Sequence, residues 1–157
     1  MYELKRIQKL PISVEEAWDF FSRPENLAEI TPDNMGFIIK SDVPEKMYSG
    51  LLIDYTVKPL LGIPLNWQTE ILDVDEYKSF ADNQNKGPYK LWHHTHIFEP
   101  IEGGVKMTDI VKYELPLGIL GNIAHALFVK NKLNHIFDYR FKKVEELFGE
   151  YESKTTA

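Results

Sequence analysis

The sequence predicts an α+β fold in which an antiparallel sheet of about seven strands is followed by one long C-terminal helix. Three observations predict it. Short strand-like segments separated by turn residues fill positions 36–115, two helix-start signals follow the first strand, and a helical apolar repeat runs through 119–150. Because 157 residues is the length of one domain, we assign residues 1–150 to a single domain and 151–157 to a polar tail.

The N-terminal part of the chain predicts one strand and two short helices. Residues 2–10 alternate loosely between apolar and charged positions and stop at Pro11, as a strand does. Ser13 begins a capping box, in which a hydroxyl satisfies a free amide of the first helical turn, so a helix is expected over about 14–22. A second helix start, with a proline in its first turn, predicts another short helix over about 24–30.

Six further strands are expected before the long helix. The connections between them are short and rich in Gly, Pro, Asn and Ser, which favour turns. Parallel strands need a long crossover connection, so strands this close together must pair antiparallel. The six segments are 36–41, 51–58, 64–75, 79–84, 89–99 and 105–115.

The C-terminal segment 119–150 predicts one continuous amphipathic helix. It contains no proline, and Gly121 is its only glycine before Gly149. Apolar residues recur there at helical spacing with lysines and glutamates between them, which is typical of a helix that covers a core with one face.

Composition excludes several function classes. The formal charge of -6 and the isoelectric point near 5.4 disfavour nucleic acid as a partner, because nucleic-acid binding depends on clustered Lys and Arg. The chain has no cysteine, which excludes disulfides and thiolate metal sites. No apolar run approaches the length of a transmembrane segment, and no secretion signal is evident, so a cytoplasmic location is expected.

Three local motifs and the order of the elements resemble a known superfamily. The motifs are FADNQ at 80–84, GPYKLWHHTHIF at 87–98 and DIVKYELPLG at 109–118. Over nearly its whole length the chain resembles the START-like, or SRPBCC, superfamily, which includes Bet v 1 proteins and polyketide cyclases, and within it a bacterial ligand-binding subfamily. The resemblance implies a helix-grip fold, in which a curved sheet wraps around the long helix and encloses a cavity.

Strand parity then predicts which side chains face that cavity. In the strand 89–99 the two-residue period places Trp92, His94, His96 and Phe98 on one face, and two large rings flanking two imidazoles favour that face as the interior. His93 lies on the opposite face and is expected at the outer surface. The predicted ligand-binding residues are Tyr55, Trp67, Asp82, Gln84, Trp92, His94, His96, Phe98, Asp109, Tyr113, Leu127 and Phe128.

The histidines and aspartates of this set have three interpretations. We favour a polar network inside the core, since buried imidazoles need hydrogen-bond partners. A metal site formed by His94 and His96 with a carboxylate, and a general acid or base, are the alternatives. No metal and no cofactor is included in the prediction. His125 and His135 are expected on the helix surface, and Arg140 is expected to form a salt bridge with a carboxylate of the sheet.

The resulting functional prediction is an intracellular binding protein for a hydrophobic or amphipathic small molecule. An enzyme of the cyclase or dehydratase type would use the same imidazoles and carboxylates for proton transfer, and binding is favoured over catalysis. A third alternative is a protein-interaction module. It would use the two apolar loops at 59–64 and 115–121 as a cavity portal, a homodimer contact or a membrane-touching lip.

Overall fold

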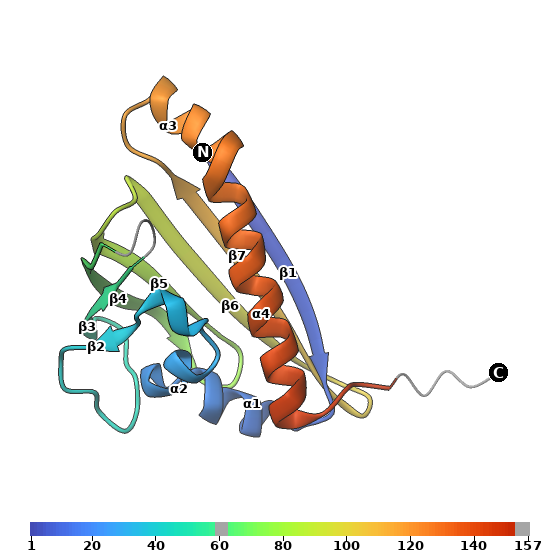
Figure 1. Ribbon diagram of the computed structural model, residues 1–157. Helices are drawn as coiled ribbons and strands as arrows, with labels where there is room; N and C mark the ends of the chain where they lie inside the picture. Colours follow the sequence, from blue (N-terminus) through green and yellow to red (C-terminus); the bar gives the residue numbers. More distant parts are fainter. Residues whose placement is uncertain (59–62, 153–157) are drawn as a thin grey trace.

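Seven antiparallel strands form one sheet in the order β1-β7-β6-β5-β4-β3-β2, so the first and the last strand of the chain are neighbours. Residues 1–58 and 63–152 are described here from a computed structural model. The long helix lies across one face of the sheet, as Figure 1 shows. The strands are β1 (Tyr2–Leu10), β2 (Ile38–Ile39), β3 (Leu52–Val57), β4 (Leu65–Asp75), β5 (Ser79–Lys86), β6 (Leu91–Ile101) and β7 (Gly104–Glu114).

The shorter helical segments lie at the two ends of the long helix. The two short helices lie at one end of the long helix, and the 119–129 segment lies at its other end (Figure 1). Each strand and helix predicted from the sequence is present, with bounds that differ by a few residues. The helices are α1 (Val14–Phe21), α2 (Pro24–Glu29), the 3-10 turn η1 (Asp33–Met35), α3 (Ile119–Ala124), the π-helical turn η2 (His125–Val129) and α4 (Lys130–Phe148).

The predicted capping box is present at the start of α1. Ser13 has an extended backbone, and its Oγ accepts a hydrogen bond of 3.1 Å from the backbone amide of Glu16. This bond satisfies one of the amides that have no partner within the first helical turn. The capped helix places Ala17 and Trp18 against the sheet, where both are buried.

The long C-terminal helix has the predicted extent but not the predicted regularity. Residues 119–148 are helical throughout, yet the turn from His125 to Val129 is a π-helix. A π turn accommodates one additional residue and rotates the helix that precedes it relative to the helix that follows. The spacing of apolar residues on a regular helix therefore does not predict which side chains of this turn face the sheet.

The buried apolar residues form three separate clusters. One joins α1, the C-terminal part of α4 and the ends of β1, β5, β6 and β7, and includes Leu10, Trp18, Phe98 and Val144. The other two lie around Val111 and Phe137, and around Ile53 and Ile71. The interior thus contains three separate packed clusters and not one continuous core.

Leu10 should be one of the most sensitive positions for stability, because its side chain is fully buried in the first cluster. Leu10→Ala is expected to lower the free energy of unfolding by about 2–5 kcal/mol, the usual cost of a cavity in a core. Leu127→Ala, at a position that is 59% exposed, is the matched control and should change it by less than about 0.5 kcal/mol. Urea denaturation followed by circular dichroism measures both; equal losses would contradict the assignment of the core.

Candidate ligand cavity

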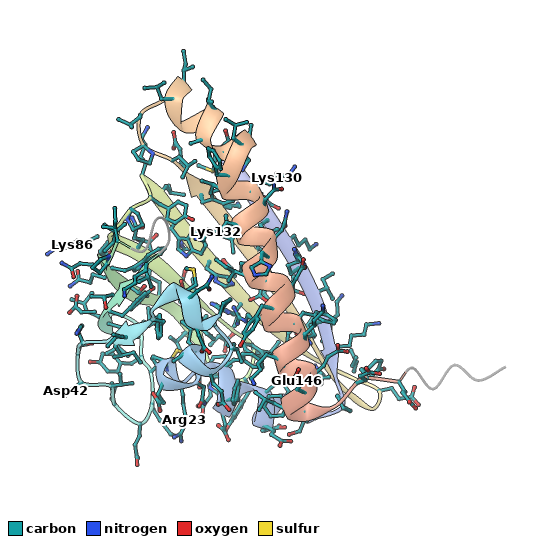
Figure 2. The ribbon with its side chains drawn as sticks, viewed as in Figure 1. Arg23, Asp42, Lys86, Lys130, Lys132 and Glu146 are labelled. Carbon is teal, nitrogen blue, oxygen red and sulfur yellow. The ribbon has the colours of Figure 1, made fainter. Side chains whose placement is uncertain are left out.

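A cavity of about 430 Å³ lies between the sheet and the long helix. Its walls are the inner faces of β3 to β6, the turn between α1 and α2, the 115–121 segment and the facing side of α4. Most of the lining is apolar, and the volume falls within the range of small-molecule sites in proteins. Lys132, on α4, and Arg23, just before α2, are cations in its wall (Figure 2).

Aromatic rings form the wall on the β3–β4–β6 side. The indoles of Trp67 and Trp92 meet edge to face with centroids 5.5 Å apart, and Tyr55 stacks on Trp67 at 5.8 Å. Tyr89 contacts both indoles. The Tyr55 hydroxyl shares a hydrogen bond of 3.0 Å with Thr69, but Trp67 Nε1 is buried without a hydrogen-bond partner among the described residues. Since a buried N–H without a partner costs free energy, this donor is suited to an acceptor on a bound molecule.

Two histidines and two aspartates form a compact cluster at the inner end of the cavity. His96 Nε2 lies 2.6 Å from Asp82 Oδ2, and His94 Nε2 lies 2.8 Å from Asp109 Oδ1. The two imidazoles stack with centroids 3.8 Å apart. The sheet register explains the arrangement, because β6 pairs His94 with Asp82 of β5 on one side and His96 with Asp109 of β7 on the other.

The electrostatics of the cluster place a proton on one imidazole in preference to the other. Burial lowers the pKa of His94, and the neighbouring His96 lowers it further, against the effect of the two carboxylates. Burial also opposes the charge on His96, but hydrogen bonds to Asp109 and Asp82 outweigh it and raise its pKa above the ordinary value. His94 is therefore the neutral ring and His96 the one that more readily carries a proton.

Both carboxyl groups stay ionised in this setting. Burial opposes the charge on Asp82, but His94 and His96 overcome that effect and lower its pKa. Burial acts on Asp109 in the same direction, and the Arg140 guanidinium together with the hydrogen bonds from the imidazoles holds its pKa well below the usual range. The cluster is thus a network of paired charges, as buried ionisable groups require.

Arg140 does not form the predicted salt bridge. No carboxylate oxygen of residues 1–58 or 63–152 lies within 4.0 Å of its guanidinium, which instead lies over the rings of Phe21 at 5.7 Å and Phe137 at 5.8 Å. The side chain lines the cavity next to the histidine–aspartate cluster. Its charge acts on Asp109 and Asp82 over a longer distance than a direct ion pair.

The structure brings half of the predicted ligand-binding residues to the cavity wall. These six are Tyr55, Trp67, Asp82, Trp92, His94 and His96. Asp109 lies behind them, on the far side of the two imidazoles. His93 points to the other face of β6, as predicted, and its ring contacts Asn83.

The other predicted positions lie elsewhere. Phe98 packs against Trp18 in the first apolar cluster, because β6 runs past the end of the cavity into the core. Gln84 bonds the backbone of Tyr89 at 2.7 Å and 3.1 Å and so stabilises the turn between β5 and β6. Tyr113 is buried in the cluster around Val111, where its hydroxyl shares a 2.7 Å hydrogen bond with His125.

Leu127 and Phe128 are not part of the cavity wall. They lie in the π turn and are 59% and 62% exposed, and Phe128, nine residues before the buried Phe137, is on the opposite side of the helix from it. The same turn directs His125 inward, where it is 9% exposed and stacks on Tyr2 at 3.5 Å. The prediction of a surface position for His125 is therefore wrong, and no local sequence pattern indicated the π turn.

Large apolar side chains are exposed around the mouth of the cavity. We call six of them the apolar tip: Leu117, Ile119, Leu120, Ile123, Leu127 and Phe128. Leu117 and Leu120 also line the cavity, so the tip is continuous with its apolar wall. Of the other predicted apolar loop, residues 59–62 lie outside the described part of the chain.

The Tyr113–His125 hydrogen bond should stabilise the docking of the π turn on the sheet. Tyr113→Phe leaves the buried His125 without this partner and is expected to lower the free energy of unfolding by about 1–3 kcal/mol. The matched control is Tyr2→Phe, which keeps the ring stacked on His125 and removes only an exposed bond to Asn122. Its cost should be at most about 1 kcal/mol. Thermal and urea unfolding of both variants test this; a larger loss in the control would contradict it.

Comparison with known proteins finds matches in structure but not in sequence. No family model matches the chain, and no curated protein matches its sequence. Among solved structures, a START superfamily protein from Mycobacterium smegmatis superposes with a TM-score of 0.67 at 15% identity, over 94% of this chain and 99% of that one. Ara h 8.0201, a Bet v 1 allergen, superposes with a TM-score of 0.61 at 17% identity, over 92% and 98%.

A third similar structure is that of TTHA0849 from Thermus thermophilus. It superposes with a TM-score of 0.67 at 17% identity, over 92% of this chain and 95% of that one. These matches show that the chain has the START-like, Bet v 1-like helix-grip fold, as the sequence motifs indicated. No helix among the described residues is long and apolar enough to cross a membrane.

Proposed function

We propose that this protein binds a hydrophobic or amphipathic small molecule inside the cell, in the cavity between the sheet and α4. The supporting observation is the cavity itself, with its volume of about 430 Å³ and its mostly apolar wall. Protein interiors are normally close-packed, so a void of this size in a chain of 157 residues leaves many apolar side chains without contacts. A bound apolar molecule would supply those contacts.

The polar groups in the wall favour an amphipathic ligand over a purely hydrocarbon one. The indole N–H of Trp67 has no hydrogen-bond partner among the described residues, and the His96–Asp82 pair faces the same space. A few polar groups in an apolar pocket give a ligand its orientation. A ligand with one or two oxygen acceptors at one end and an apolar body would match this distribution.

The enzyme alternative is favoured by one observation, the placement of the His96–Asp82 pair in the cavity wall at 2.6 Å. Such a pair can hold and transfer a proton to a bound molecule, which is the chemistry of a cyclase or dehydratase. Binding requires only the cavity, while catalysis also requires a substrate atom within hydrogen-bond reach of His96. We therefore propose binding as the primary function.

Occupancy of the cavity can be tested with the fluorescent apolar anion 1-anilinonaphthalene-8-sulfonate. One equivalent should bind and reduce the emission of Trp67 and Trp92, whose rings line the cavity. Ala124→Trp, which adds a bulky ring to the cavity wall, should weaken binding at least tenfold. Ala126→Trp is the matched control, since Ala126 is exposed and outside the wall. Equal binding by both variants, with native circular dichroism, would contradict the proposal.

The apolar tip is the proposed route into the cavity. Its leucines at 117 and 120 belong both to the exposed surface and to the cavity wall, so a ligand would contact them first. The alternative of an interaction module or homodimer contact uses the same surface.

Stopped-flow fluorescence with the same dye can separate these roles. Leu120→Asp should slow dye association several-fold, while Leu147→Asp, at an exposed position near the far end of α4, should leave it unchanged. Analytical ultracentrifugation of both variants provides the second measurement. A change in self-association with no change in dye kinetics would assign the tip to a protein contact and overturn its role as the entrance.

A further inference from the structure

The two imidazoles of the histidine–aspartate cluster each lie between the same two carboxylates. His96 Nε2 and His94 Nδ1 lie 2.6 Å and 3.7 Å from Asp82 Oδ2. The opposite ring nitrogens, His94 Nε2 and His96 Nδ1, lie 2.8 Å and 3.3 Å from Asp109 Oδ1. Each ring therefore directs one nitrogen to Asp82 and the other to Asp109.

The two carboxylates are not equivalent. Asp82 lines the cavity together with His94 and His96, whereas Asp109 does not reach it. Asp109 lies on the opposite side of the rings, where the Arg140 charge is the largest attractive influence on it. The Asp82 side thus faces the large cavity, whereas Asp109 faces a separate hollow of only about 30 Å³, which Arg6 and Arg140 also line.

We propose that Asp82, His94 and His96 bind a divalent transition-metal ion at the inner end of the cavity. The ligand atoms are one Asp82 carboxylate oxygen, His94 Nδ1 and His96 Nε2. One candidate atom from each of these residues lies within 4.8 Å of the others. Donors bound to one ion at about 2.0–2.2 Å lie roughly 3–3.5 Å apart, and the present 2.6 Å and 3.7 Å separations lie on either side of that range.

The donor set indicates the class of metal. Two imidazoles and one carboxylate suit Zn²⁺ or Fe²⁺, and such three-ligand sites leave coordination positions open. Here the open positions face the cavity, because all three ligands lie in its wall. Water or an oxygen group of a bound molecule would complete the coordination.

Asp109 would act as a positioning residue. In protein metal sites the second nitrogen of a ligating histidine usually donates to a carboxylate or carbonyl, which fixes the tautomer and the ring orientation. Asp109 Oδ1 is within 2.8 Å of His94 Nε2 and 3.3 Å of His96 Nδ1, so one carboxylate serves both rings. In the metal-bound protein this arrangement would leave the lone pairs of His94 Nδ1 and His96 Nε2 free for the ion.

The local charge also favours a cation. With both imidazoles neutral, the carboxylates of Asp82 and Asp109 carry two negative charges against the one positive charge of Arg140. A divalent ion between His96 and Asp82 would compensate the remaining negative charge.

The test is uptake of Zn²⁺ and Co²⁺ alone, without any organic ligand, by the full chain after removal of any affinity tag. Equilibrium dialysis followed by elemental analysis should give one equivalent of Zn²⁺. Bound Co²⁺ should show d–d absorption that Zn²⁺ removes. Asp82→Asn and His96→Gln should abolish uptake, and Asp109→Asn should weaken it about 10- to 100-fold. His93→Gln, on the same strand but the opposite face, should bind as the unaltered protein does.

Two results would overturn the metal site. The first is absence of stoichiometric Zn²⁺ and Co²⁺ uptake by the unaltered protein, which is decisive even if a variant fails to fold. The second is equal uptake by the unaltered protein and by natively folded Asp82→Asn and His96→Gln. Because the dye-binding experiment does not depend on metal, failure of the metal site and failure of the proposed binding function can be distinguished.

Discussion

The two-residue period of strand β6 is the constraint on which the site depends. It directs Trp92, His94, His96 and Phe98 to one face in sequence, so a single strand runs from the aromatic wall, through the ionisable cluster, into the apolar core. The neighbouring strands then supply the partners: β5 provides Asp82, and β7 provides Asp109 on the other side. A shift of one residue in register would direct the imidazoles to the outer face and leave both carboxylates without partners.

Two apolar clusters hold the long helix on the sheet beside the cavity. The α1 helix and the C-terminal part of α4 pack against the sheet around Val144, while Leu133 and Phe137 pack near Val111. Trp92 packs against the second cluster and contacts Trp67, so the aromatic wall of the cavity is continuous with that cluster. The paired charges of the histidine–aspartate cluster oppose collapse, because moving them into a dry interior without partners would be costly.

The π turn connects the surface of the molecule with its interior. Its Leu127 and Phe128 side chains are exposed, and its His125 side chain is buried, where Tyr113 and Tyr2 contact the imidazole from the sheet side. The exposed apolar side chains therefore lie at the cavity mouth, on a helical turn that is attached to the sheet through His125. Such turns are often found at functional positions in helices, and here the turn separates the exposed tip from the part of the helix that lines the cavity.

The sequence alone determined the elements, the antiparallel sheet and the inward face of β6, because these depend on local periodicity, turn residues and short connections. It also indicated which histidines and carboxylates could meet. Only the tertiary structure decided that Asp82 faces the cavity while Asp109 lies behind the rings, that Phe98 belongs to the core, and that Leu127 and Phe128 are exposed. The first two outcomes depend on where a strand crosses the cavity boundary, which leaves no repeating pattern in the sequence. The π turn at His125 leaves none either, whereas the exposure of Phe128 agrees with its spacing of nine residues from the buried Phe137.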